Sequence, residues 1–128
     1  MLIEKYREGL VDAANFNCAE KLLNLGNQVL ELDLPPQALR LSAGFGAGMG
    51  IESVCGAVTG AIMILSAINV DTVARESKVY KINRKFLLKV EERLGTINCK
   101  ELKAKYYDSE SKCQSIIEAV IECLDENL

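Results

Sequence analysis

Residues 44–60 have the sequence Gly44-Phe-Gly-Ala-Gly-Met-Gly-Ile-Glu-Ser-Val-Cys55-Gly-Ala-Val-Thr-Gly60. Four glycines at alternate positions lead to a cysteine that is followed at once by glycine and alanine. Glycine destabilises regular structure and is favoured where the backbone turns at positive φ or comes close to another group. The segment therefore predicts a glycine-rich loop that leads into a central helix and forms a backbone cradle around the Cys55 thiol.

On both sides of this loop, apolar residues recur at spacings of three and four, which predicts helices. No segment alternates apolar and polar residues between turn signals, so we expect no sheet. The expected helices are one from Leu2 to Ala13 or Ala14, one capped by Asn15 or Asn17, one from Pro35 and Pro36 to about Ser42, one from Glu52 or Ser53 to about Ile68, one from Asp71 or Thr72 to Leu94, a short one after Cys99, and one from Ser109 to Leu124. The sequence therefore predicts an all-α, single-domain bundle of six or seven helices over residues 1–128.

The two longest C-terminal helices have apolar stripes that predict which side faces the core. Gly95 is expected to end the fifth helix as its C-terminal cap. The predicted inward residues are Val73, Tyr80, Phe86, Leu87, Val90 and Leu94 on the fifth helix, and Ile116, Ile117, Val120 and Leu124 on the last.

The overall composition excludes several classes of function. The chain has 49% hydrophobic and 26% charged residues with a net charge of −3, which is typical of a globular domain and not of a nucleic-acid-binding one. The longest apolar stretch, residues 56–68, is too short to span a bilayer, so we expect no membrane insertion. The first residues lack the order of a signal peptide, which favours a cytoplasmic location where thiols stay reduced.

Four of the five cysteines lie at or near the expected starts of helices: Cys18, Cys55, Cys99 and Cys113. Unpaired amides and the positive end of the helix dipole favour a thiolate there, and Cys55 is expected to have the most depressed pKa. We expect the four thiols to meet in one site. The alternative is that they are small buried core residues and that the glycines only permit close helix crossing. Cys123 lies in an acidic last turn, which is expected to raise its pKa and make it a poor ligand.

The motifs that are absent narrow the chemistry of such a site. The chain has no Cys-x-x-Cys pair, which excludes the thioredoxin-like motif, the common zinc knuckles and the usual ferredoxin runs. It has no histidine, which excludes Cys₂His₂ zinc sites and Cys-His or Ser-His catalytic pairs. The glycine run lacks the Gly-x-Gly-x-x-Gly spacing of a dinucleotide fold. Four thiolates suit an iron–sulfur cluster or Zn²⁺ equally well.

The fifth helix carries many basic side chains. This pattern indicates a solvated face, with an anionic partner as the alternative. The residues are Lys78, Lys81, Arg84, Lys85, Lys89 and Arg93.

These motifs together resemble a known family. The sequence resembles the redox-active proteins named for their C_GCAxxG_C_C pattern. The matching features are the Cys18-Ala19 pair, the glycine-rich segment to Gly50, the Cys55-Gly56-Ala57-x-x-Gly60 motif, and the later Cys99 and Cys113. The resemblance runs from about Phe16 to Cys113 and implies a small helical protein with an iron–sulfur or similar prosthetic group. It also implies an oxidoreductase or a transporter-associated protein as a partner, and a likeness to the cluster-bearing part of certain multihaem cytochromes.

The sequence thus favours a cytoplasmic redox protein that binds an iron–sulfur cluster through four cysteines and transfers electrons. Zinc, or no metal at all, is the alternative. The expected cofactor-binding glycines are Gly46, Gly48, Gly50, Gly56 and Gly60. Two alternative functions are a metal-free thiol–disulfide redox protein and a non-catalytic helical interaction module. Each of the three functions is compatible with a homo-oligomer. The sequence assigns no residue a catalytic role.

Overall fold

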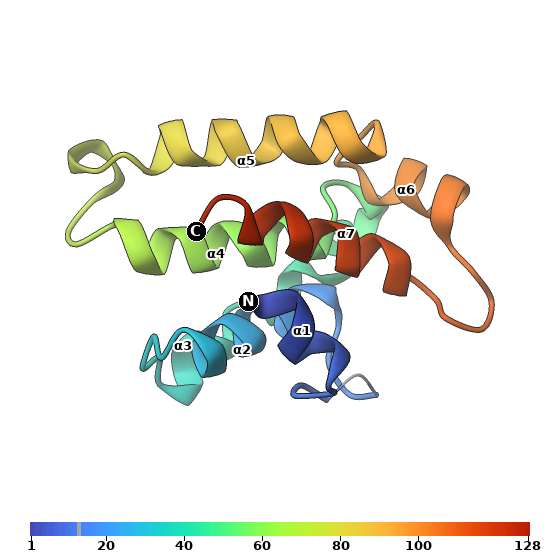
Figure 1. Cartoon of the computed structure of the whole chain (residues 1–128), viewed down its shortest axis with the longest axis horizontal. Coiled ribbons are helices and arrows are strands. Elements are labelled where there is room, and N and C mark those ends of the chain that lie inside the picture. Colours follow the sequence, from blue (N-terminus) through green and yellow to red (C-terminus); the bar gives the residue numbers. More distant parts are fainter. Residues whose placement is uncertain (13) are drawn as a thin grey trace.

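The computed structural model describes residues 1–12 and 14–128, and within them the chain forms seven α-helices and no strand (Figure 1). This confirms the predicted all-α bundle. Three short helical turns, η1 to η3, interrupt the sequence of α-helices. The elements are α1 (Leu2–Arg7), α2 (Cys18–Val29), α3 (Pro36–Arg40), η1 (Ala43–Phe45), η2 (Gly48–Glu52), α4 (Gly56–Asn69), η3 (Ala74–Glu76), α5 (Val79–Leu94), α6 (Cys99–Tyr106) and α7 (Gln114–Asp125).

The central element is α4, which contains no charged residue. It packs against α2, α5 and α7, while α1 packs against α2 and α7. In Figure 1, α5 lies along one edge of the molecule, and α1, α2 and α3 lie on the opposite side of α4 and α7. The fully buried side chains of the core come from all of the longer helices and include Leu22, Leu25, Ile64, Phe86, Leu102, Ile117 and Val120.

Local sequence signals fix several helix ends. The side chain of Asn17 accepts a hydrogen bond from the Glu20 amide at 3.0 Å, and the Glu20 carboxylate accepts one from the Asn17 amide at 2.9 Å. This reciprocal capping box starts α2 at Cys18 and confirms Asn17 as the cap. Gly95 ends α5 with φ of 87°, as predicted.

The glycine-rich segment forms a loop before α4, as expected, but α4 starts at Gly56 and not at Glu52 or Ser53. The reason is a left-handed turn over residues 47–52. Four consecutive residues, Ala47 to Gly50, have φ between 53° and 78°, and Glu52 has φ of 55°. A right-handed helix is excluded at these dihedral angles, so α4 begins only after this turn ends.

Three other predicted helices are shorter than expected, and the last of them, α7, begins at Gln114 and not at Ser109. Gly9, with φ of 79°, follows α1, so Leu10 lies outside the helix and is exposed, and Ala13 lies outside the described residues. Ser77 is extended, with φ of −135° and ψ of 175°, and it separates η3 from α5. For this reason Val73 lies outside α5 and does not join the buried stripe. Tyr80 is within α5 but on its exposed side, whereas Phe86, Val90 and Leu94 are buried.

The predicted inward residues of α7 are all buried: Ile116, Ile117, Val120 and Leu124. Among the described residues, no helix has both the length and the apolarity that a bilayer crossing requires.

Candidate functional site

Four helix N-termini carry the four cysteines that the sequence groups together. Cys18 and Cys99 are the first residues of α2 and α6, and Cys55 and Cys113 immediately precede α4 and α7. All four line one pocket of about 390 Å³, called the cysteine pocket here. Residues up to 95 positions apart, Cys18 and Cys113, thus face the same cavity.

Two backbone hydrogen bonds join the segments that carry Cys55 and Cys99. The Cys55 amide donates to the Ile97 carbonyl at 2.8 Å, and the Cys99 amide donates to the Ser53 carbonyl at 2.6 Å. The two segments form an isolated antiparallel bridge between Val54 and Asn98. The bridge fixes the starts of α4 and α6 side by side.

Two glycines of α4 let its N-terminal half approach α2. A Cβ atom added at Gly56 would lie 3.0 Å from the Phe45 carbonyl oxygen and 3.3 Å from Cys18 Cβ. A Cβ atom at Gly60 would lie 2.7 Å from Leu22 Cβ and 2.8 Å from the Ala19 carbonyl oxygen. Gly56 lines the cysteine pocket, and Gly60 lies one turn further along the crossing of α2 and α4.

The three glycines of the preceding loop lie outside the residues that line the cavity. A Cβ atom at Gly46 would collide with the side chain of Asn17, which caps α2. One at Gly48 would lie 2.9 Å from Cys99 Cβ and would collide with the Ser53 backbone. Gly50 has open space around it and φ of 78°, so its role is conformational.

Burial dominates the electrostatics of the thiols. Burial and the neighbouring thiols of Cys55 and Cys113 raise the pKa of Cys18 to about 12. Burial also raises the pKa of Cys55, although the amides of Ala57 and Val58 act in the opposite direction. The sequence-based expectation that Cys55 has the most depressed pKa is therefore wrong, because loss of solvation outweighs the helix N-terminus.

The other two affected thiols follow the same rule. Burial raises the pKa of Cys99, while the ammonium group of Lys103 opposes this shift. Burial also raises the pKa of Cys123, which confirms the expected direction, and Glu126 and Glu122 add to it. Cys123 is remote from the cysteine pocket and lines a separate groove with Lys89 and Arg93.

Three lysines also line the cysteine pocket, and sequence reasoning missed them: Lys21, Lys103 and Lys112. Each stands close to a pocket cysteine in sequence, three positions after Cys18, four after Cys99 and one before Cys113. Spacings of three and four on a helix place two side chains on one face, which is the signal that would have found the first two.

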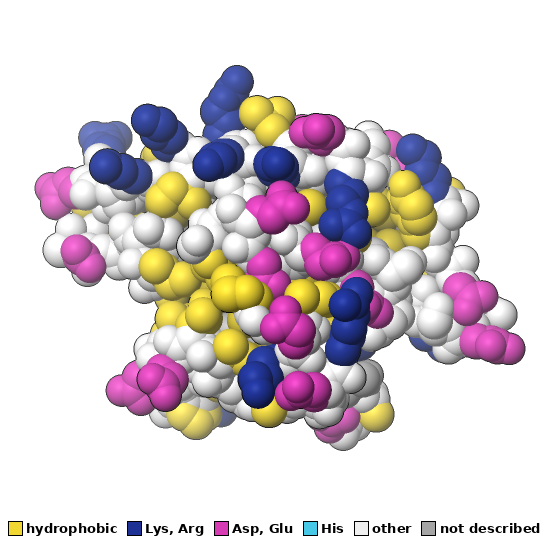
Figure 2. Space-filling model, viewed as in Figure 1, with side chains coloured by type: hydrophobic (Ala, Val, Ile, Leu, Met, Phe, Trp, Pro, Cys, Tyr) yellow, Lys and Arg dark blue, Asp and Glu magenta, His cyan; other side chains and the backbone are white. Residues whose placement is uncertain are grey.

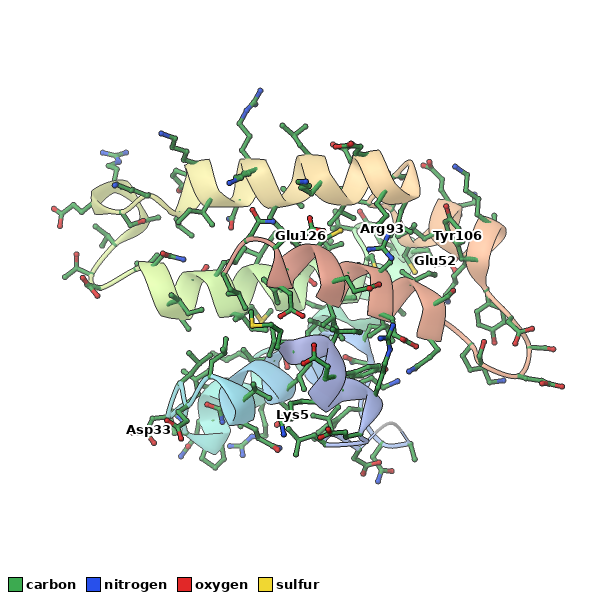
Figure 3. All side chains as sticks on the ribbon, in the orientation of Figure 1. Lys5, Asp33, Glu52, Arg93, Tyr106 and Glu126 are labelled. Atoms are coloured by element: carbon green, nitrogen blue, oxygen red, sulfur yellow. The ribbon has the colours of Figure 1, made fainter. Side chains whose placement is uncertain are left out.

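One of these lysines is held by an ion pair. Lys103 Nζ lies 3.4 Å from a carboxylate oxygen of Glu52, at the end of the molecule that carries α6 and Tyr106 (Figure 3). Burial lowers the pKa of Lys103, but Cys99 and Glu52 outweigh this effect and the net direction is upward. Lys103 is therefore a fixed positive charge beside the thiols.

The four cysteines line the cavity without forming a compact ligand group. Among residues 1–12 and 14–128, no three Cys, Asp, Glu or His side chains form a group that could hold a metal ion. A tetrahedral zinc site with Zn–S bonds near 2.3 Å needs sulfur atoms about 3.8 Å apart. The pocket is thus a cavity shared by the four cysteines.

Comparison with known proteins places this arrangement in a family. The sequence model of the family described as "Putative redox-active protein (C_GCAxxG_C_C)" matches residues 16–127. No curated protein and no solved structure matches the chain. Because the family match spans nearly the whole chain and includes all four cysteines of the pocket, the protein belongs to the C_GCAxxG_C_C family.

Proposed function

We propose that the protein is an electron carrier that holds an iron–sulfur cluster in the cysteine pocket through Cys18, Cys55, Cys99 and Cys113. The observation that carries the proposal is the convergence of four cysteine-bearing helix N-termini on one cavity. Thiolates are the ligands of iron–sulfur clusters, and the amides at helix starts donate hydrogen bonds that tune the potential of such centres. When bound, a cluster of this kind supplies one-electron transfer.

Four thiolates suit a cluster or zinc equally well, and the size of the cavity favours the larger group. The thiols line about 390 Å³, and no three of them form a group that could hold one ion in the described parts of the chain. Four thiolates around a cluster leave an anionic centre, and Lys21 and Lys103 in the pocket wall offset that charge. Without a cation in the pocket, the Cys18 thiolate is poorly solvated and is repelled by the neighbouring thiolates, and its pKa is raised. A bound metal supplies the positive charge that stabilises the thiolate.

A metal-free thiol–disulfide function is less well supported. Such chemistry requires a thiolate near neutral pH. Burial raises the pKa of Cys18, Cys55 and Cys99, which disfavours the thiolate of each in the absence of a metal. The surroundings therefore do not activate any of these three thiols as a nucleophile.

Purification without oxygen tests the proposal. We expect visible charge-transfer absorption, together with iron and acid-labile sulfide in amounts that scale with protein. Zinc without colour would contradict the cluster and favour a mononuclear site. A colourless, metal-free protein with a quantifiable disulfide among the pocket cysteines would favour thiol–disulfide chemistry instead.

A further inference from the structure

The charges of this chain are segregated onto one helix. Residues 74–94, which include η3 and α5, contain seven Lys or Arg and three Glu, a net charge of +4. The rest of the chain contains eight Lys or Arg and fifteen Asp or Glu, a net charge of −7. Figure 2 shows the resulting row of basic side chains along the edge of the molecule that α5 occupies.

Few of these basic side chains form an ion pair in the part of the chain that the structure describes. Lys89 and Arg93 are paired, with Glu126 and Glu122. Five others form no salt bridge within the described parts of the chain: Arg75, Lys78, Lys81, Arg84 and Lys85. They form the basic face of α5.

The basic face destabilises its own helix. Lys81 and Lys85 stand four positions apart, and like charges at this spacing cost about 0.2–0.5 kcal/mol per pair. Lys78 caps the helix and its first turn contains no acidic residue, so positive charge lies at the positive end of the helix dipole. A bound anionic surface would offset this repulsion.

A shallow groove of about 460 Å³ lies along α5, and its wall carries one basic side chain, Arg84, and one acidic side chain, Glu91. Tyr80, which is 71% exposed, and Leu88, which is 52% exposed, lie beside Arg84 in its wall. Tyrosine and arginine are the residue types enriched where protein interfaces gain most of their binding energy. The helix therefore carries exposed basic side chains, such as Lys81 and Lys85, together with the exposed apolar anchors of the groove, a combination found at protein-docking surfaces.

The other anionic occupants fit less well. The main apolar side of α5, with Phe86 and Val90, is already buried in the core, so little apolar surface remains to enter a membrane. The chain is acidic overall and the groove contains a single aromatic side chain, which gives nucleic-acid bases few platforms for stacking. We propose that the basic face of α5 docks an acidic, amphipathic segment of a partner protein. The inference stands apart from the proposed cluster, because it uses none of the pocket residues.

A designed peptide tests this surface on the full chain. The probe is a 20-residue amphipathic helix with glutamate on its polar side and leucine on its apolar side. We expect its binding, followed by amide chemical shifts in the ¹⁵N-labelled protein, to perturb residues 75–91. The affinity is expected to fall about tenfold between 50 and 200 mM salt, because exposed charges are screened.

Matched charge reversals locate the interaction. Lys81→Glu with Lys85→Glu is expected to weaken peptide binding at least about tenfold. Lys100→Glu with Lys105→Glu changes the net charge equally on the exposed side of α6 and is expected to leave the affinity within about twofold. Tyr80→Ser, at an exposed position, tests the apolar anchor without changing charge and is expected to weaken binding.

Three results would overturn the proposal. One is equal loss of affinity in the two charge-reversed pairs, and another is a set of shifts centred away from α5. The third is that the protein binds vesicles of phosphatidylserine and phosphatidylcholine, or a 20-base-pair DNA duplex, through α5 more tightly than it binds the peptide. We expect all of these variants to keep their iron content and visible absorption, because none of the changed residues lines the cysteine pocket. The docking proposal and the cluster proposal can therefore be rejected independently of each other.

Discussion

At the scale of single residues, the thiol of Cys18 shows which electrostatic effect dominates the site. It is the first residue of α2, where the helix dipole favours the thiolate by about 0.3–1 kcal/mol. That is less than one pKa unit, whereas burial shifts a pKa by up to 3–5 units. The net result is a pKa of about 12, with burial as the largest cause.

This shift makes stability depend on pH in the metal-free, reduced protein. The folded protein holds the Cys18 proton more tightly than the unfolded chain, whose thiol has a pKa near 9.0. The resulting stabilisation is complete below pH 9 and is lost progressively as the pH rises towards 12. We expect the melting temperature to fall more steeply between pH 8.5 and 10.5 in the native sequence than in Cys18→Ser.

The other groups with raised pKa values are Cys55, Cys99, Cys123 and Tyr6, and burial, the largest cause for each, is common to both proteins. The charge of Cys18 also raises the pKa of Tyr6, so the difference in slope reports Cys18 together with its effect on Tyr6. Parallel slopes would show that the Cys18 thiol is no harder to ionise in the folded protein than in the unfolded chain.

At the scale of elements, the left-handed turn over residues 47–52 brings the chain from α3 to the pocket. Ala47, Met49 and Glu52 have positive φ without being glycine, at a cost of about 1–2 kcal/mol each. The turn is closed by a hydrogen bond from the Ser53 amide to the Gly48 carbonyl at 3.0 Å. The Ser53 carbonyl also accepts a hydrogen bond from the Cys99 amide, so contact with the start of α6 stabilises the strained turn.

Neighbouring positions of this turn predict opposite effects. Met49 is partly exposed with φ of 62°, so Met49→Gly is expected to raise the free energy of unfolding by up to about 1 kcal/mol. Gly50 has φ of 78° and open space, so Gly50→Ala is expected to lower it by about 1 kcal/mol. Chemical denaturation measures both, and the same sign for the two variants would contradict a left-handed turn.

The crossing of α2 and α4 gives a second test. Helix propensity alone favours Gly60→Val by a few tenths of a kcal/mol. The new Cβ would lie 2.8 Å from the Ala19 carbonyl oxygen, and overpacking of this kind costs about 1–3 kcal/mol. We therefore expect a lower melting temperature. Gly44→Val is the matched control, because no heavy atom lies within 4 Å of a Cβ there. Equal melting temperatures for the two variants would show that the close crossing is unimportant.

Sequence patterns predicted which helices are present better than they predicted the residues at which those helices begin and end. The Asn17 cap and the Gly95 end follow from side-chain and backbone chemistry within a few residues, so they could be predicted locally. Val73 and Tyr80 have the correct spacing for a buried stripe, but the extended backbone at Ser77 removes Val73 from the helix. Tyr80 is in α5 and is exposed, because packing against α4 and α7 decides which side of the helix is covered.

At the scale of the whole molecule, four separate helix starts meet at one cavity, and α1 is tied to both ends of α7. The Asp125 carboxylate at the end of α7 accepts hydrogen bonds from the Leu2 and Ile3 amides at 2.9 and 3.1 Å. The Tyr6 hydroxyl donates to Gln114 at 2.8 Å, near the start of α7. The pocket was predictable as a set of cysteines, but the lysines in its wall depend on tertiary packing as well as on spacing.

The central claim is that four cysteines, and not the fifth, hold one prosthetic group. The most direct measurement is the iron and acid-labile sulfide content of five single variants purified without oxygen: Cys18→Ser, Cys55→Ser, Cys99→Ser, Cys113→Ser and Cys123→Ser. We expect each of the first four to lose most of its iron and visible absorption, while Cys123→Ser keeps both, because Cys123 lies in a separate groove. Full iron in any two of the first four variants, or loss of iron only in Cys123→Ser, would contradict the shared site.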